Sequence, residues 1–484
     1  MDPSISAATL DAVREALSKP VANGSDLAKA TATTPGISTS SLLYGYNLEA
    51  PAKTLVPILT PLRNRLPRKG GGHGTAVEWK AVTAINTTNL DPGVAEGSRG
   101  TVPSISTATF SAGYRTLCFP GEVTLQSIWA AREFDDALNR GTVTTLQTTM
   151  LGEELILLGG NKTAIGKPAS VAFVDTDADA SGSLTYSTTY YYAVSALTLQ
   201  GWNAGRTGIV AAADAIGETD ARTGNHGTTA SGAGSDSTTI SWPAVRGASA
   251  YNVYVGTTST CYYRATVTGN TYTLASAPSN TGHLPNAADQ TASATVFDGI
   301  IPQLEAAGSG AYFKDLAGAK LTPDNAGGVV EIDAMLKAIW DTARLGPKTI
   351  LVSSQEALSI TKAYLTTGAT GALRVVPTVG ANGLLTAGFF VASYLNKYVP
   401  AQPVVSIEVH PNMPPGKIVA IIETLPSWYP DANVSGVFEV DVRQEYTQYD
   451  FAFTQLKREF GVYVDEVLKC YLPAACGVIT GIGA

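Results

Sequence analysis

Four histidines are the side chains best suited to acid–base or metal chemistry in this 484-residue chain: His73, His226, His283 and His410. All four lie in Gly- or Pro-rich stretches, and none forms the HExxH pair that binds zinc on a helix. We therefore expect them in surface loops. No serine has glycine both two places before and two places after it, so the nucleophile elbow of the hydrolases is missing. The sequence predicts no catalytic residue and no enzyme.

Four cysteines and one glycine-rich run are further candidates for chemistry. The cysteines are Cys118, Cys261, Cys470 and Cys476. No two of them are spaced as CxxC, so reduced thiols are a better interpretation than a zinc or redox site. The run KGGGHG from Lys69 to Gly74 lacks the Gly-Lys-Ser/Thr ending of a phosphate-binding loop. We interpret this run as a flexible hinge.

Asp175, Asp177 and Asp179 alternate like the first ligands of a calcium loop. Such a loop also needs glycine at its sixth position and a bidentate glutamate at its twelfth. These positions hold Ala180 and Tyr186, so we interpret the three acids as a solvated turn. The sequence thus predicts no metal and no cofactor.

One long amphipathic helix is expected from Ser127 to Gly160, because apolar residues recur at spacings of three, four and seven or eight. These residues are Ile128, Trp129, Leu138, Leu146, Met150, Leu151, Leu155 and Leu158. Ser127 can serve as the N-cap and Gly160 can end the helix. The poor helix formers around Gly141 predict a bend or a short break there. A helix of roughly 30 residues would be about 45 Å long, so other parts of the chain must pack along it.

Two acidic pairs, Asp135-Asp136 and Glu153-Glu154, fall on this expected helix. Adjacent helical positions point about 100° apart, so neither pair can act jointly as an acid and a base. We interpret both pairs as lying on a solvated or inter-subunit face.

Composition limits the classes of function that are open to the chain. Only 15% of residues are charged, and Asp+Glu 40 against Lys+Arg 32 gives a net charge of −8. This acidic balance disfavours tight binding of nucleic acid, which depends on Lys and Arg neutralising phosphates. A weakly charged surface suits burial against other chains; a turn-rich β fold would have a similar composition, but we favour the first interpretation. No apolar run is long enough to predict a membrane span, and no secretory signal is visible.

Two runs with period-two alternation, 77–85 and 107–119, predict a long β-hairpin. A two-stranded hairpin is marginally stable in water by itself, so its apolar face must be covered. Trp79 can pack on its own chain or on the next subunit, and we favour the next subunit. The candidate interface residues are Val77, Trp79, Ile85, Phe110, Tyr114, Asp135 and Asp136.

Residues 164–292 differ from their surroundings, because Gly, Ser, Thr and Tyr replace helix formers and short strand-like runs alternate with turns. Trp242, followed by the run Tyr251–Tyr254, is similar to the core pattern of fibronectin type III or immunoglobulin-like modules. The run YYYAVSA, which would suit a late strand of such a module, precedes Trp242. We therefore expect an all-β sandwich with an unusual strand order.

The remaining chain mixes helices and strands, so the predicted fold class is α+β. Residues 1–54 are poor in apolar side chains and predict an arm, and Leu55–Leu66 is interpreted as an extended connector. After the β-rich region, periodicity predicts helices at Val330–Leu345 and Gln355–Leu365 and strands at Thr349–Val352, Val404–Val409, Ile418–Ile422 and Phe438–Tyr446.

The order of these parts resembles the major capsid proteins of tailed bacteriophages, which share the Hong Kong 97-like capsid fold. The hairpin at Val77–Phe119 is similar to the extended loop of that family, and the helix at Ser127–Gly160 to its spine helix. The run Lys348–Leu358 is similar to part of its axial domain, and Val404–Ile422 and Thr454–Val464 to its closing strands. The resemblance divides the chain into an N-terminal arm 1–54, a connector and extended hairpin loop 55–122, the spine helix of a peripheral domain 123–163, an inserted immunoglobulin-like β-sandwich 164–292, a mainly axial domain 293–437, and closing strands of the peripheral domain 438–484.

This resemblance implies a structural protein of the virion, which self-assembles as pentamers and hexamers into the icosahedral head shell around the phage genome. Its partners would be copies of itself and separate scaffold, portal and decoration proteins. Double-stranded DNA would be enclosed without sequence-specific binding, no membrane would be involved, and assembly would take place in the host cytoplasm. The insert would project from the outer face, where its removal would be tolerated. The alternative is a surface adhesin or tail-associated binding protein that uses the immunoglobulin-like module.

Overall fold

The computed structural model describes residues 53–483 with internal gaps. These gaps are 86–91, 101, 133, 177–181, 186, 206–214, 228–236, 325–326, 367–377, 380–384, 387–390, 400–403, 424, 426–433 and 435. Most of the predicted arm, 1–54, therefore lies outside the described residues. The chain divides into two compact units, one formed by Met1–Leu55 with Ala131–Asp136 and the other by Val56–Ala130 with Ala137–Ala484. The second unit contains the described helices and strands.

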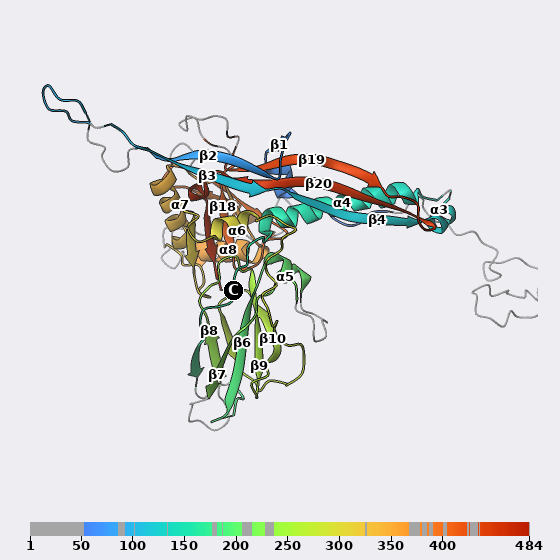
Figure 1. Ribbon diagram of the computed structural model, residues 1–484. Coiled ribbons are helices and arrows are strands. Elements are labelled where there is room, and N and C mark those ends of the chain that lie inside the picture. Colours follow the sequence, from blue (N-terminus) through green and yellow to red (C-terminus); the bar gives the residue numbers. More distant parts are fainter. Residues whose placement is uncertain are drawn as a thin grey trace, which may run out of the picture. The chain divides into compact units, whose positions relative to one another are not determined.

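A four-stranded sheet with a long helix against it forms one part of this unit. Across the sheet the strands are β1 (Arg68–Gly70), β19 (Phe438–Asp450), β20 (Lys457–Cys470) and β4 (Arg115–Thr124). β1 runs parallel to β19, and the other neighbours are antiparallel. Helix α4 (Ala137–Gly159) lies along β4 and β20 (Figure 1), and the short helix α2 (Pro61–Arg65) packs on α4.

The prediction of a single helix from Ser127 to Gly160 is wrong for the first third of that range. The structure has a short helix, α3 (Leu125–Ala130), followed by the connection Ala131–Asp136, and α4 begins only at Ala137. Ser127 is not an N-cap, because its own N–H donates to Thr124 Oγ1 (3.3 Å) inside the first turn. The helix is not broken near Gly141, since α4 continues through that residue.

Small residues let α4 approach the sheet closely, which explains the poor helix-forming sequence around Gly141. A Cβ atom at Gly141 would lie 2.8 Å from Val123 Cγ2, and one at Gly121 of β4 would lie 2.4 Å from Thr145 Oγ1 of the helix. Threonine hydroxyls of α4, such as that of Thr145, donate to the carbonyl four residues earlier, which satisfies them within the helix.

The second strand of the predicted hairpin, 107–119, is divided between two sheets. β3 (Ile105–Gly113) pairs with β2 (Ala76–Ile85) as predicted, whereas β4 pairs with β20. The two strands meet at Tyr114, whose side chain is buried in the core. The alternation expected through Cys118 therefore fails after Tyr114, and the next buried side chain is that of Leu117.

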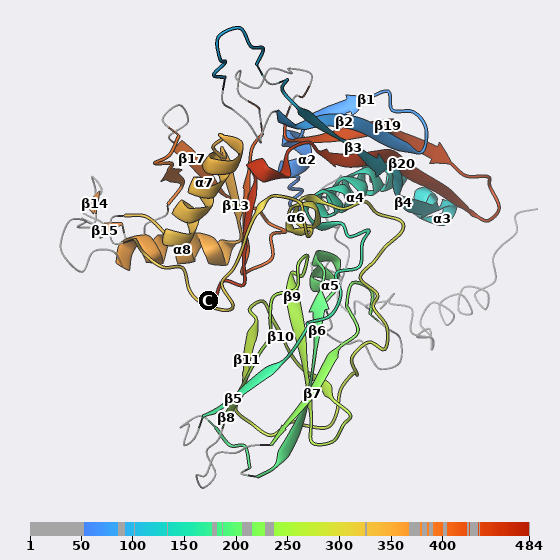
Figure 2. The ribbon, with the colours of Figure 1, turned by 60° about the vertical axis from the view of Figure 1, so that its left-hand side comes forward.

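Between α4 and α6 (Ile300–Glu305), the chain forms two antiparallel sheets that pack as a sandwich (Figure 2). One sheet has the order β10-β9-β6-β7 and the other β11-β8-β5. The strands are β5 (Ala172–Thr176), β6 (Thr189–Leu197), β7 (Arg222–Gly227), β8 (Ser237–Ser241), β9 (Ala250–Gly256), β10 (Tyr262–Val267) and β11 (Thr271–Leu274). A short helix, α5 (Leu199–Ala204), follows β6.

The strand order of this sandwich is unusual, as the sequence predicted. β6, which carries the YYYAVSA run, lies between β7 and β9 and precedes β8, the strand that leads to Trp242. Trp242 is buried and meets Tyr251 of β9 edge to face, with ring centroids 5.4 Å apart. Side chains from both sheets surround this aromatic pair, so the sandwich has a core of its own.

Buried contacts also join the sandwich to α6 and to the strand β12 (Tyr312–Asp315). Glu305 of α6 accepts a hydrogen bond from the N–H of Gly247 (2.5 Å). It also forms an ion pair with Lys417. The guanidinium of Arg246 lies over the ring of Phe313, 4.4 Å from its centroid. The sandwich is thus packed against other parts of the chain, so the expectation that its removal is tolerated does not follow from the structure.

A six-stranded mixed sheet forms the last part of the unit. Across this sheet the strands are β12, β21 (Gly477–Thr480), β18 (Ile418–Ile421), β13 (Thr349–Val352), β17 (Val404–Val409) and β16 (Ser393–Leu395). The helices α7 (Val330–Ala343) and α8 (Ser354–Thr366) share a core with it. The small elements are β14 (Thr378–Val379), β15 (Leu385–Thr386) and the 3-10 turn η3 (Pro473–Ala475). β21 returns to this sheet after β19 and β20 have completed the four-stranded one.

Most of the expected elements after the sandwich are present with nearly the predicted bounds, and the α+β class is confirmed. The predicted strands Thr349–Val352 and Val404–Val409 match β13 and β17. The interpretation of Leu55–Leu66 as wholly extended is wrong, because Pro61 begins α2. Proline suits that first helical position, where its missing N–H leaves no hydrogen bond unmade.

Substitution of Gly121 by alanine tests the close approach of α4 to the sheet. The new Cβ would meet Thr145 Oγ1 and the Phe460 ring at 2.4 and 2.7 Å, so we expect a loss of about 1–3 kcal/mol in the free energy of unfolding. Urea unfolding of the purified chain measures this loss. Gly70→Ala is the matched control, because a Cβ there has no neighbour within 4 Å. Equal stability of the two variants would contradict the close packing.

Candidate subunit interface and its anchor

The outer half of the β2–β3 hairpin carries large apolar side chains that the described part of the chain leaves uncovered. Val82, Ile85 and Ile105 expose 57, 65 and 65% of their surface. Ile85 pairs directly with Ile105, beyond a bulge between Val82 and Ala84. Among the described strands, β2 and β3 pair only with each other, so both outer edges of the hairpin offer backbone groups to a further strand.

The base of the hairpin, in contrast, packs on its own chain. Trp79 stacks on Phe110, with ring centroids 5.7 Å apart, and meets Tyr471 edge to face at 5.8 Å. Val77 packs against the core, and Tyr114 is buried with its hydroxyl donating to Asp441 Oδ1 (2.6 Å). This is the first of the two arrangements considered for Trp79. Of the predicted hairpin residues, Ile85 and Phe110 are exposed, Val77 and Trp79 are half-buried, and Tyr114 is removed from the surface.

Asp135 and Asp136 do not lie on a helix, so that expectation is wrong. They belong to the connection Ala131–Asp136, which is part of the other compact unit and precedes α4 in the sequence.

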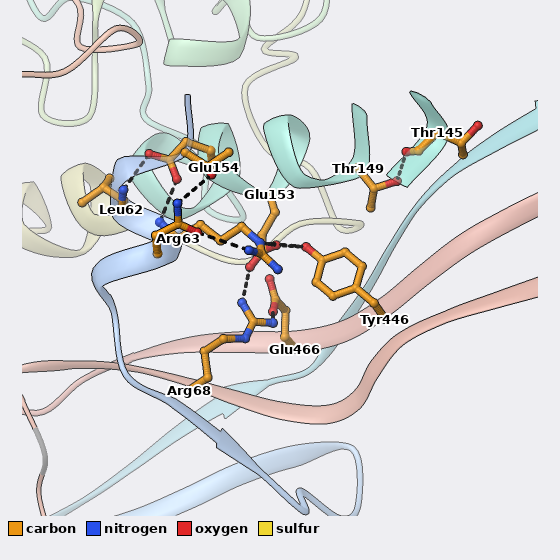
Figure 3. A network of polar contacts seen from close by, with 11 residues as sticks. Leu62, Arg63, Arg68, Thr145, Thr149, Glu153, Glu154, Tyr446 and Glu466 are labelled. Carbon is orange, nitrogen blue, oxygen red and sulfur yellow. Dashed lines mark hydrogen bonds and ion pairs between the residues drawn. The ribbon is translucent and has the colours of Figure 1, made fainter. Parts of the chain in front are cut away.

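A buried carboxylate on α4 holds the segment that leads into the hairpin (Figure 3). Glu154 is fully buried, and its oxygens accept hydrogen bonds from the N–H groups of Leu62 (2.9 Å) and Arg63 (2.8 Å) in the first turn of α2. His410 Nε2 donates to the same carboxylate (2.7 Å), because Nδ1 accepts from the N–H of Asn412. Glu154 thus caps a helix that has no side-chain cap from its own N-cap residue.

Glu153 is as deeply buried and joins α4 to the neighbouring arginines (Figure 3). It forms ion pairs with Arg63 of α2 and Arg68 of β1, and it accepts a hydrogen bond from Tyr446 of β19. Arg68 also reaches Glu466 of β20, with Nη2 2.6 Å from Oε2. These contacts define an anchor network that connects α2, α4 and three strands. Its members are Arg63, Arg68, Glu153, Glu154, His410, Tyr446 and Glu466.

The sequence-based placement of Glu153 and Glu154 on a solvated or inter-subunit face is therefore wrong. Removing one partner from a buried ion pair costs about 3–5 kcal/mol, because the other charge is left without compensation. The only sequence signal for this burial is the closely spaced Arg63, Arg65 and Arg68 in the segment interpreted as a connector. Arg65 meets other acids, Glu408 and Glu423. Periodicity cannot reveal pairs so distant in sequence.

One member of the anchor network titrates far from its usual range. Burial and the neighbouring charge of Glu153 raise the pKa of Glu466 to about 8, against the opposing effect of Arg68. The Glu466 carboxyl group is therefore largely protonated at neutral pH. The anchor network has a structural role, because each of its side chains contacts a group from another segment of the chain.

Among the described residues, no group of three or more His, Cys, Asp or Glu side chains could hold a metal ion. The expectation of surface loops is wrong for His283 and His410, which are buried, and for His226, which lies on β7 with Nε2 3.0 Å from Asp175 Oδ2. Asp177 and Asp179 lie outside the described residues. The cysteines are free thiols; burial raises the pKa of Cys261 to about 11 and that of Cys476 to about 12, which makes these two unreactive.

The described helices include none with both the length and the hydropathy needed to cross a membrane.

Comparison with known proteins gives matches among solved structures only. No protein-family model and no curated protein matches the sequence. Similar structures include the capsid of Myoviridae phage XM1 (9% identity, 93% of this chain and 100% of that chain, TM-score 0.41) and the capsid of a native GTA particle (9%, 92% and 97%, 0.42). The SrpI encapsulin of Synechococcus elongatus PCC 7942 is similar as well (8%, 92% and 95%, 0.42).

The fold itself contains the parts that the resemblance to phage major capsid proteins implied. An extended hairpin precedes a long helix, the helix lies on the strands that come late in the chain, and a mixed α+β part with its own core follows an all-β insert. The order of parts along the chain is the predicted one.

Replacement of Glu466 by glutamine tests the anchor network through its pH dependence. A folded-state pKa of about 8 lies above the ordinary value of 4.5, so the folded protein binds more protons than the unfolded chain between these values. The contribution of Glu466 to stability is therefore full below about pH 4.5 and is lost as the pH rises through about 8. We expect Glu466→Gln to flatten this decline, as measured by urea midpoints from about pH 5 to pH 9.

Glu459→Gln is the matched control for that experiment, because Glu459 lies on the same strand, is partly exposed and pairs with Lys457. We expect it to follow the wild-type curve. Parallel curves for wild type and Glu466→Gln would contradict the raised pKa.

Proposed function

We propose that this protein is the major capsid protein of a tailed bacteriophage and that copies of it self-assemble into the icosahedral head shell around the phage genome. The observation that carries the proposal is the outer half of the β2–β3 hairpin, where Val82, Ile85 and Ile105 are more than half exposed. A water-exposed hairpin of this kind has little stability of its own, because its apolar side chains gain nothing until a second surface covers them.

Copies of the same chain are the cover that the proposal names. A closed shell requires each subunit to present complementary patches that symmetry repeats, and many modest contacts then add up to a stable object. The base of the hairpin is packed against Tyr471 and the core, so its direction is fixed by the subunit before any neighbour arrives. A fixed base with an uncovered outer half is suited to reaching onto a neighbour.

The parts of the chain take the roles that the resemblance implies. We assign α4 with the four-stranded sheet to a peripheral domain, the six-stranded sheet with α7 and α8 to an axial domain, and the sandwich to an insert between them. Pentamers and hexamers would form around the axial domain. Scaffold, portal and decoration proteins would be further partners, and assembly would take place in the host cytoplasm.

Charge supports enclosure of DNA in preference to tight binding of it. The chain has a net charge of −8, and many of its cations are already paired, as Arg63, Arg68 and Lys469 are. Phosphate binding depends on available Lys and Arg side chains, so a shell of this composition would bind the DNA weakly and without sequence specificity.

The variant Ile85→Asp/Ile105→Lys tests the proposal. These positions pair directly, so the new charges are opposite and can meet across the hairpin, which preserves its strands. We expect thermal unfolding of the unassembled subunit to shift little, while particles seen by electron microscopy and sedimentation are lost under conditions in which wild type forms them.

Two controls accompany this variant. Ile85→Val/Ile105→Val keeps the surface apolar and should assemble, and Val174→Asp places a charge on an equally exposed apolar residue of β5 and should assemble as well. Normal particles from Ile85→Asp/Ile105→Lys would overturn the role of the hairpin. Absence of wild-type particles, with and without a scaffold protein, would overturn the proposed function.

A further inference from the structure

A buried lysine lies between two carboxylates on the paired strands β19 and β20. Lys469 of β20 is directly opposite Glu439 of β19, and Asp441 follows on the same face of β19 two residues later. All three are buried, with 3, 4 and 4% of their surface exposed. This cluster adjoins the base of the hairpin through Tyr114 and Tyr471, and it shares no residue with the anchor network.

The distances bring the amine against both acids. Lys469 Nζ is 2.8 Å from Glu439 Oε1 and 2.9 Å from Asp441 Oδ2. The Tyr114 hydroxyl donates to the other Asp441 oxygen, Oδ1 (2.6 Å), and the Tyr471 hydroxyl donates to Glu439 Oε1 (3.1 Å). The Asp441 carboxyl is therefore polarised on one oxygen by a phenol while an amine touches the other.

The charges of this cluster do not balance. Two carboxylates and one ammonium carry a net charge of −1, and each is withdrawn from water at considerable cost. Burial lowers the pKa of Lys469, but the hydrogen bonds to Asp441 and Glu439 outweigh it and leave that pKa raised, so the ion pair is the resting state. Proton transfer from Lys469 to a carboxyl group would give a neutral amine and a neutral acid, which a water-poor site disfavours less than bulk water does.

We propose that Lys469 and Asp441 condense to form an intramolecular amide bond that links β20 to β19. The Lys469 ammonium first gives one proton to Asp441 Oδ2. The resulting amine then attacks Asp441 Cγ, so that a C–N bond forms and the C–Oδ2 bond breaks. Glu439 accepts a proton from the attacking nitrogen and delivers it to the departing oxygen, which leaves as water. The sum is ammonium plus carboxylate giving an amide and one water, so no oxidant, reductant or further reactant is needed.

The residues around the reacting atoms have distinct roles in this step. Tyr114 withdraws electron density from Asp441 through its hydrogen bond, as an oxyanion-hole donor does for a developing alkoxide. Glu439 touches the reacting nitrogen and acts as the general base and acid. The product replaces one buried charge pair with a neutral amide and joins the two strands that support the hairpin base.

A second buried lysine in the same chain serves as the internal comparison. Lys417 is as buried as Lys469 and forms an ion pair with the fully buried Glu305. In the described part of the chain, Glu305 is its only carboxylate partner, and the second oxygen of Glu305 accepts from the N–H of Gly247. Without a second acid to carry the proton, this pair should remain an ion pair.

Mass spectrometry of the purified wild-type chain tests the proposal directly. We expect the intact protein to be lighter than its sequence by one water, and a tryptic digest to contain the peptides of Lys469 and Asp441 joined by an amide. The peptides of Lys417 and Glu305 should be unlinked. An intact mass equal to that of the sequence, in unassembled and assembled protein alike, with separate peptides, would overturn the proposal.

Two variants then assign the roles. Lys469→Arg keeps the positive charge but cannot form the amide, so it should have the full mass. Glu439→Gln keeps both reacting groups, and we expect bond formation to be slowed by about 10²-fold or more because the proton carrier is lost. Circular dichroism verifies that each is folded. A Glu439→Gln chain that links as fast as wild type would remove Glu439 from the reaction, and the wild-type mass decides the proposal whichever variant folds.

Discussion

Two adjacent buried carboxylates need partners that compensate their charge, and this need constrains how the rest of the chain is arranged. Glu153 and Glu154 lie on the part of α4 that packs against other segments, and neither reaches solvent. Their partners are the N–H groups of α2 and the side chains of Arg63, Arg68 and His410. Because Arg68 begins β1, the carboxylates set where the chain enters the four-stranded sheet and where the hairpin starts.

The hairpin is therefore fixed at one end and uncovered at the other. Its base shares the core of the subunit through Val77 and the aromatic contact of Trp79 with Tyr471. Its outer half contributes almost nothing to that core, although it is as apolar as many buried strands. Hydrophobic stabilisation scales with the area removed from water, so most of what the outer half can contribute becomes available only when a second surface covers it.

Local patterns in the sequence predicted the local structure well. The strands at Thr349–Val352 and Val404–Val409, the hairpin and the unusual order of the sandwich follow from alternation and from turn residues. The failures share one cause, which is pairing between distant segments. Arginine side chains compensate Glu153, and backbone N–H groups compensate Glu154, from positions some 90 residues earlier. Asp135 falls in a helix break that the apolar spacing does not register. The spacing of apolar residues indicates which face of a helix or strand is buried, but it does not identify the segment that packs on that face.

Hydrogen exchange at the hairpin amides, compared between unassembled subunits and assembled particles, tests the central claim most directly. We predict that the amides around Val82, Ile85 and Ile105 exchange rapidly in the free subunit and gain protection on assembly, whereas those around Trp79 are protected in both states. Equal exchange of the outer half in both states would contradict the claim that copies of this chain cover it.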